Sequence, residues 1–238
     1  MNRSRVGKWA RRAVWGTLLA VAAIGCNPLN IAAFMFAREE VRPAPHPLAF
    51  SKDGPKKDKE EVVVVLLPQV APGASREFVT ADRELAEKLS RLLPELAKQN
   101  KDKDARKLRV ISPTQVDKFK MANPQWKQMS AGDIGHKLGA DFVLEIYLDK
   151  MRLYQPQSNN GIYEGRAEVS VGIHEIGESG GELKDRYTHA FNYPKGLVRD
   201  ASAISESEFK KQYFEALTAE IARYHVDSKM SNSIADGR

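Results

Sequence analysis

The chain has 238 residues, enough for one ordinary domain with extensions at its ends. Its net charge of +6 is concentrated at the N-terminus, where the first 25 residues carry five basic side chains and no acidic ones. Without these five, 32 basic and 31 acidic residues remain, which is a net charge of +1. A nearly neutral domain has no broad positive field that would attract phosphates, so we expect no nucleic-acid partner.

The N-terminal segment is typical of a bacterial signal peptide. Residues 1–12, which carry the five basic side chains, precede the uncharged and mostly apolar stretch Ala13–Gly25, which has the length of a signal-peptide core and is short for a membrane span. The stretch ends in Ala-Ile-Gly directly before Cys26, the only cysteine, and small residues before a cysteine resemble a bacterial lipobox. We therefore expect residues 1–25 to be removed and Cys26 to carry the acyl chains that hold the protein on a membrane.

An uncleaved signal anchor is the alternative, and simple secretion is a third possibility. No charge occurs from Ala13 to Ala37, but Pro28 falls in the middle of this run, where it would break a helix. With either tether the domain lies outside the cytoplasm, because the basic flank stays inside. Asn27, directly after the cysteine, resembles the enterobacterial sorting pattern for the outer membrane.

Beyond the tether the composition predicts three regions. Residues 26–60 are rich in proline and lysine and are expected to form a flexible linker that follows the lipidated cysteine. Residues 61–227 are expected to form a single α/β domain. Residues 228–238 are polar and are expected to form a disordered tail.

The first half of the domain alternates between apolar runs and helical patterns. Val62–Leu67 is a continuous β-branched run that predicts a strand covered on both faces and ending at Pro68. A helix of about 20 residues is expected from Thr80, and Pro94 should kink or split it. A short strand at Leu108–Ile111 follows. Two helices are then predicted by their capping residues, Ser112 before a proline and Ser130 three residues before Asp133.

The second half contains three alternating runs, Asp141–Tyr154, Ile162–Ile176 and Glu182–Tyr193. Alternation predicts an antiparallel three-stranded meander with one buried and one wet face. A last helix is expected from the capping residue Ser205. The predicted fold class is therefore α/β (α+β), with a mixed sheet of about five strands and helices packed on it.

The turn Leu138-Gly139-Ala140-Asp141, between a short helix and a long strand, resembles a group of bacterial envelope lipoproteins. The group comprises the CsgG-like curli-assembly proteins, the lipoprotein activators of penicillin-binding proteins and the N-terminal domain of TolB. The resemblance extends over residues 61–225 in the order of elements. It implies a protein-binding or envelope-assembly module rather than an enzyme.

The sequence shows no assembled catalytic or metal-binding motif, so no cofactor and no metal are expected. Two histidines of the meander, His174 and His189, could be neighbours across a strand pair. Four carboxylates of the same region could supply a hydrolytic pair, although an exposed strand face explains them without chemistry: Glu164, Glu168, Glu175 and Asp185. A membrane-anchored hydrolase or small-ligand-binding protein that uses this face is therefore the alternative function.

The leading hypothesis is a non-catalytic lipoprotein of the cell envelope, tethered to the membrane, whose domain binds a protein partner in envelope assembly or maintenance. Aromatic side chains are the most effective anchors of protein interfaces. Trp126 lies in an otherwise polar loop, and Tyr154 and Tyr163 lie on the meander. These three residues are the predicted partner contacts.

Overall fold

The computed structural model describes residues 41–48, 60–72, 76–99, 107–178, 180–196 and 199–229. The predicted signal peptide and Cys26 lie outside these residues and stay predictions. The strands are β1 (Val41–Arg42), β2 (Glu61–Val70), β3 (Lys107–Val110), β4 (Phe142–Tyr154), β5 (Ile162–Gly177), β6 (Gly180–Tyr193), β7 (Arg199–Asp200) and β8 (Ser228–Lys229). The helices are α3 (Ala81–Gln99), α4 (Pro113–Ala122), α5 (Ala131–Leu138) and α6 (Glu206–His225), with short 3-10 turns η1 (Arg76–Phe78) and η2 (Trp126–Gln128).

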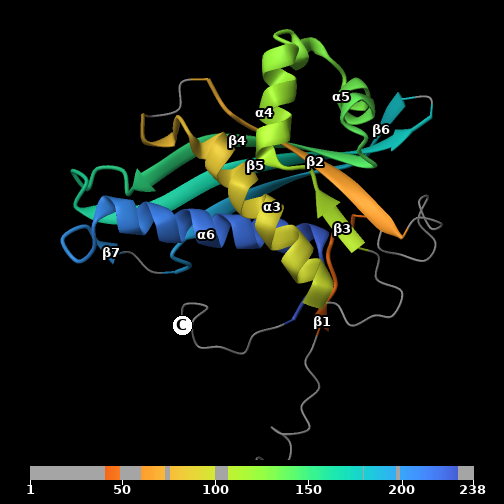
Figure 1. Cartoon of the computed structure of the whole chain (residues 1–238). Coiled ribbons are helices and arrows are strands. Elements are labelled where there is room, and N and C mark those ends of the chain that lie inside the picture. The colour runs from red at the N-terminus through yellow and green to blue at the C-terminus, as the bar shows by residue number, and fades with distance from the viewer. Residues whose placement is uncertain are drawn as a thin grey trace, which may run out of the picture. The chain divides into compact units, whose positions relative to one another are not determined.

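The central sheet is mixed, in the order β3-β2-β4-β5-β6, and β7 pairs with the start of β5 (Figure 1). Strand β2 runs parallel to both β3 and β4, whereas β4, β5 and β6 form an antiparallel meander. This confirms the predicted fold class, the mixed sheet and the meander.

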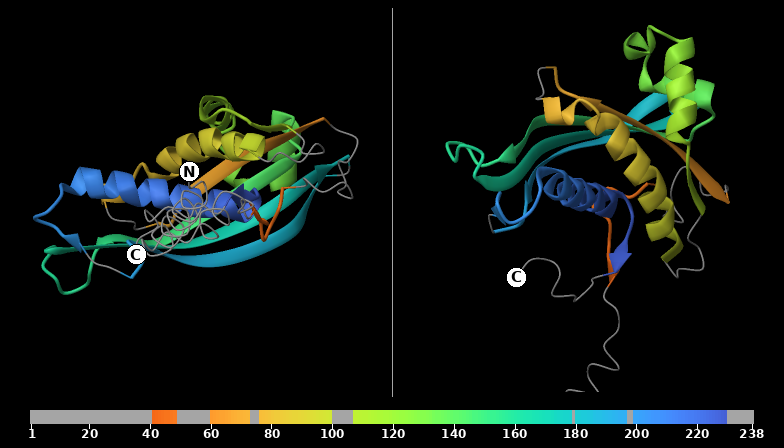
Figure 2. Two further views of the ribbon diagram at one scale, coloured as in Figure 1. Left: turned by 90° about the horizontal axis from the view of Figure 1, so that it is seen from below. Right: turned by 60° about the vertical axis from the view of Figure 1, so that its left-hand side comes forward.

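Helices pack on both faces of the sheet (Figure 2). Helices α3 and α6 bury the larger core against one face, with fully buried side chains such as Leu89, Phe209 and Tyr213. Helices α4 and α5 bury a smaller core, with Val116 and Ile134, against the other face. The two cores follow from the alternation of β2, whose successive residues Val62–Leu67 are buried in turn on either side.

Local capping fixes where the helices begin. The hydroxyls of Ser112, Ser130 and Ser205 accept hydrogen bonds from the backbone N–H groups three residues later. Helix α5 ends at Gly139, whose φ of 64° lies in the left-handed region that favours glycine. These caps lie where the sequence predicts them.

Two prolines interrupt their strand and helix less than the sequence predicts. Strand β2 continues through Pro68 to Val70, because β3 pairs only with Glu61–Val64 and no ladder hydrogen bond is required on that side of Pro68. Helix α3 is continuous through Pro94, so the predicted split is wrong. Proline removes one helical hydrogen bond, and the buried stripe that includes Leu89 and Leu93 holds the helix against the sheet.

The predicted linker and tail are also corrected in part. Residues 41–48, which we call the strap, pack on the domain instead of joining the linker. Leu48 is fully buried in the larger core, and its backbone N–H donates to the carbonyl of His225 at 3.3 Å. Strand β1 of the strap pairs with β8, so Ser228 and Lys229 do not belong to a free tail. Pairing partners about 180 residues away in the chain produce no local sequence pattern, which is why the strap was missed.

Candidate functional site

The meander of β4, β5 and β6 has one face that helices cover only in part. Alternate residues of β5 from Tyr163 to Ile173 point into the core under α6, so the residues between them point to the opposite side. There α5 packs only on the end of the meander, where Gly135 meets Ile176 and Gly132 meets Gly181. We call the remaining surface, which α4 and α5 leave uncovered, the open face (Figure 2).

Directly opposite residues of the three strands form rows across the open face. From β4 through β5 to β6, the rows are Glu145–Gly172–Arg186, Tyr147–Ser170–Thr188, Asp149–Glu168–Ala190 and Arg152–Arg166–Asn192. With Lys150 and Glu164, which pair with members of these rows, the open face carries four acidic and four basic side chains. The open face is therefore balanced in charge.

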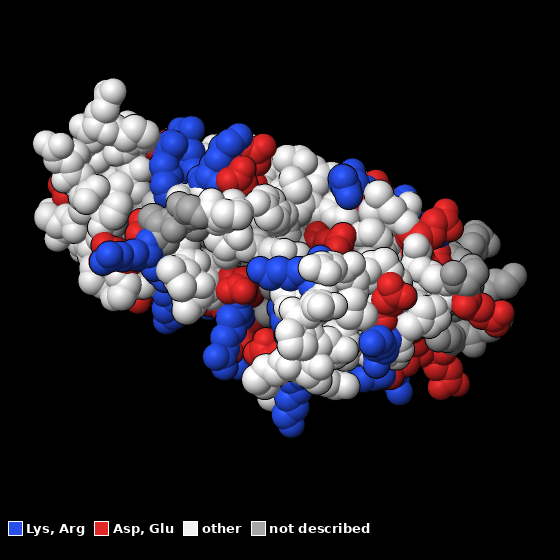
Figure 3. Space-filling view, turned by 90° about the horizontal axis from the view of Figure 1, so that it is seen from above, with Lys and Arg blue, Asp and Glu red and all other residues white. Residues whose placement is uncertain are grey.

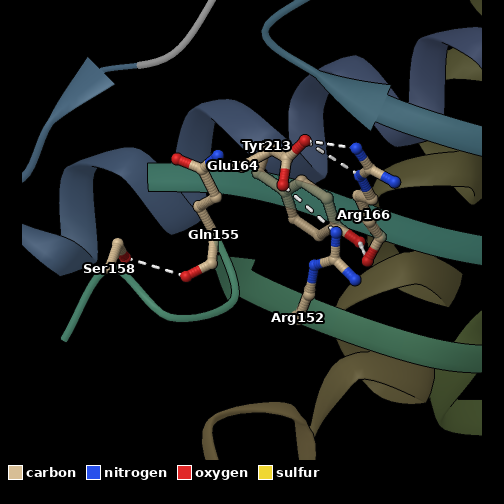
Figure 4. Close-up of polar contacts among 6 residues, drawn as sticks. All are labelled: Arg152, Gln155, Ser158, Glu164, Arg166 and Tyr213. Carbon is tan, nitrogen blue, oxygen red and sulfur yellow. Dashed lines mark hydrogen bonds and ion pairs between the residues drawn. The ribbon is translucent and has the colours of Figure 1, made fainter. Parts of the chain in front are cut away.

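One carboxylate joins two arginines at the end of the open face (Figure 4). Oε2 of Glu164 accepts from Nη2 of Arg152 at 3.1 Å, and its Oε1 accepts from Nε of Arg166 at 3.0 Å. Burial raises the pKa of Glu164, but the hydrogen bonds from Arg166 and Arg152 outweigh it and the pKa is lowered. From the other side of β5, the hydroxyl of Tyr213 donates to the carbonyl of Arg166 at 3.0 Å. The cluster is an ionised, pre-oriented group that a partner can contact through the two guanidinium ions.

The middle of the open face combines exposed aromatic area with polar groups. Tyr147 is 41% exposed, although its strand β4 is the central strand of the five-stranded order β3-β2-β4-β5-β6. Beside it, the hydroxyls of Ser170 and Thr188 are hydrogen-bonded at 3.1 Å, and Nζ of Lys150 donates to Glu168 at 2.5 Å. An aromatic side chain surrounded by paired polar groups is a common arrangement at protein interfaces.

Basic and acidic side chains are interspersed over the side of the molecule that carries α4 and α5 (Figure 3). No large area of one sign dominates this view. The distribution agrees with the balanced charge of the open face and offers no continuous basic surface to a nucleic-acid backbone.

The predicted histidine pair does not form. Nε2 of His174 contacts Oε2 of Glu145 at 2.8 Å on the open face. His189 lies on the opposite face of the sheet, where its Nδ1 contacts the hydroxyl of Tyr224 at 2.9 Å. The strand pairing separates the two rings, because His189 is opposite Val169 rather than His174.

The four predicted carboxylates do not converge either. Glu164 and Glu168 lie on the open face, each paired with basic side chains. Glu175 and Asp185 lie on the other face, where their partners are Lys184 at 3.4 Å and His46 at 2.5 Å. Within the described part of the chain, no group of three or more His, Cys, Asp or Glu side chains could hold a metal ion. A hydrolytic pair of carboxylates is therefore not assembled here.

The three predicted partner contacts lie in different surroundings. Trp126 is half-buried against the smaller core, and Nζ of Lys120 lies 4.6 Å from its ring centroid. Tyr154 is half-buried, and its hydroxyl donates to Glu206 at 2.5 Å. Tyr163 is only 3% exposed and stacks on Phe209 at 4.4 Å, so its predicted role as a partner contact is corrected to that of a core residue.

The strap adds a second cluster that sequence reasoning missed. The ring of His46 stacks on Tyr187 at 4.4 Å, and its Nδ1 contacts Asp185 at 2.5 Å. Nε2 of His225 contacts the hydroxyl of Tyr187 at 3.0 Å. The hydrogen bond from His46 lowers the pKa of Asp185, and burial lowers the pKa of His225 to about 4. In the sequence, His46 lies among prolines, and nothing local indicates its partners.

Comparisons with known proteins establish no family. No protein-family model matches the chain, and no curated protein sequence matches it. Solved structures with some similarity include a hypothetical protein, CT253, from Chlamydia trachomatis, at 16% identity and a TM-score of 0.39 over 69% of this chain and 97% of that one. Lipoprotein GNA1162 from Neisseria meningitidis has 11% identity and a TM-score of 0.37 over 68% of this chain and 97% of that one. Protein XCC0632 from Xanthomonas campestris has 14% identity and a TM-score of 0.39 over 78% and 91%. At these scores and identities, the similarities assign neither a family nor a function.

In the described ranges, no helix combines the length and the apolar character that crossing a bilayer requires. The segments that the sequence predicts as a membrane tether precede residue 41.

Proposed function

We propose that the chain is a non-catalytic envelope lipoprotein whose domain binds a protein partner through the open face of the meander, in envelope assembly or maintenance. The observation that carries the proposal is the open face itself. It is three strands wide, balanced in charge and carries the exposed ring of Tyr147. Membership of the lipoprotein groups that the turn Leu138–Asp141 resembles is part of this proposal.

The chemistry of the open face favours a protein over other ligands. Balanced charges can pair with complementary charges on a folded surface, which gives specificity and orientation to an interface. A nucleic acid needs an excess of basic groups, which this surface lacks. Tyr147 supplies apolar area and a hydroxyl in one rigid side chain, the usual properties of an interface anchor.

The tether is supported by the basic leader, the apolar run that follows it and the small residues before Cys26. The strap limits how far the domain can lie from the membrane. Because the strap begins at Val41, residues 27–40 connect Cys26 to the domain. At about 3.5 Å per residue, these residues span at most about 50 Å. The proposed partner is therefore a protein of the same membrane or of the envelope layer next to it.

Photo-cross-linking in native envelopes tests the proposal. A photoreactive residue in place of Tyr147, in the full chain, should give a discrete product with one other protein. The matched control places the same residue at Met121, which is 73% exposed on α4 and is not one of the residues of the open face. Equal products from both positions, or products of lipid and abundant bulk proteins only, would contradict the proposal.

A further inference from the structure

Strand β6 leaves a long edge of the sheet unpaired. It is hydrogen-bonded to β5 on one side, and no other described strand pairs with its outer side. The opposite edge of the sheet is β3, which has only four residues. An exposed edge offers backbone N–H and C=O groups to another strand, so proteins usually protect long edges.

Only half of the β6 edge is protected. The first half carries four charged residues within Glu182–Arg186, and a register shift between Ile173 and His174 of β5 leaves Lys184 without an opposite residue. Charges and bulges are the usual devices that block strand addition. The second half, Tyr187–Tyr193, contains no Asp, Glu, Lys or Arg and pairs with β5 without any shift. We call this half the open edge.

We propose that two copies of the chain associate by antiparallel pairing of their open edges about Ala190. The sequence of the open edge, Tyr-Thr-His-Ala-Phe-Asn-Tyr, reads nearly the same in both directions by side-chain type. Pairing about Ala190 places each Tyr187 opposite Tyr193 of the second copy, and each Thr188 opposite Asn192 of the second copy. His189 comes opposite Phe191 of the second copy, and the two Ala190 residues face each other.

These pairs are favourable for an antiparallel ladder. Small polar residues directly opposite each other stabilise adjacent strands, and the exposed Thr188 and Asn192 can form two such pairs. The aromatic residues of the open edge face α6, where they already pack on other rings. In this register, residues of the open face lie opposite residues of the open face of the second copy, because Thr188, Ala190 and Asn192 all belong to the open face. The second copy therefore extends the sheet and brings two open faces side by side.

The open edge is also bounded and accessible. Pro194, which has no N–H, directly follows Tyr193 and ends the ladder at one side, and Arg186 begins the charged half at the other. The side chains of Thr188, Ala190 and Asn192 on the open edge are all exposed. The pairing itself does not depend on the proposed partner of the open face.

Cysteine cross-linking in native envelopes tests the register. In the variant Ala190→Cys, the two introduced residues face each other, with Cβ atoms about 5 Å apart. In the control Thr188→Cys, they lie four residues apart along the ladder, about 13 Å. Mild oxidation should convert Ala190→Cys into a covalent dimer and leave Thr188→Cys a monomer. Absence of a dimer for Ala190→Cys, or equal dimer from both variants, would overturn the proposal.

A charge exchange provides an independent test on the purified full chain in detergent, by sedimentation equilibrium. Thr188→Lys with Asn192→Lys places like charges opposite each other twice and should raise the dissociation constant of the dimer at least tenfold. Thr188→Lys with Asn192→Glu places opposite charges at the same positions and should stay within about threefold of the unsubstituted chain. Both side chains are exposed, and both variants lose the same Thr188 hydroxyl. A monomeric unsubstituted chain, or equal weakening in both variants, would refute the pairing.

Discussion

The strap is the feature most at odds with a flexible linker, and Leu48→Ala tests it quantitatively. Leu48 is 0% exposed within the larger core. The substitution removes three buried carbon atoms, and at about 0.8 kcal/mol each the lost burial is about 2.4 kcal/mol. The cavity that remains adds to this, so we expect the free energy of unfolding to fall by about 2.5–4 kcal/mol.

Urea denaturation of the purified full chain measures this loss directly, as a lower midpoint with an unchanged slope. Arg42→Ala is the matched control, because Arg42 belongs to the same strap and is exposed. It should change the free energy of unfolding by no more than about 0.5 kcal/mol. If Leu48→Ala proves as stable as Arg42→Ala, the strap is not part of the folded domain and the reasoning fails.

Three further predictions concern other parts of the fold and use the same assay. Gly165→Ala places a Cβ 2.3 Å from Cδ2 of Tyr213 and should cost about 1–3 kcal/mol, whereas Gly177→Ala, with no contact nearer than 3.7 Å, should be nearly neutral. Equal effects would contradict the close packing of α6 on β5. The pKa of His225 is about 4 in the folded chain against 6.5 unfolded, so its contribution is complete above pH 6.5 and is lost as the pH falls towards 4. Between pH 8 and pH 5 the chain should lose about 2 kcal/mol more than the variant His225→Gln, and parallel pH profiles would disprove this role. Glu164→Gln removes the carboxylate between two arginines and should destabilise the chain by about 1–3 kcal/mol, and unchanged or increased stability would argue against the cluster.

The sequence predicted the elements that have a local or periodic signal. The alternation of Ile162–Ile176 identified β5 because one of its faces is buried along its whole length. The serine caps of α4, α5 and α6 were equally visible, since a hydroxyl three residues before a free N–H is a local arrangement.

Features that depend on distant contacts were not predictable. Alternation shows that the strands of the meander have two faces, but only the packing of α6 on one face decides that Tyr163 of β5 is buried, and only the positions of α4 and α5 leave Tyr147 of β4 exposed on the other. Proline rules failed at Pro68, because they assume a neighbour on both sides of the strand. The strap is held by the stacking of His46 on Tyr187, a contact that no pattern within residues 41–48 reveals.

The identity of the mature N-terminus tests the central claim, which is that this domain lies outside the cytoplasm and is held by a lipid tether. Intact mass spectrometry of the protein extracted from its native membrane reads that terminus in one measurement. The account predicts a polypeptide that begins at Cys26 and carries the additional mass of acyl chains. A mass equal to the full unmodified chain, with Met1 to Gly25 retained, would contradict it.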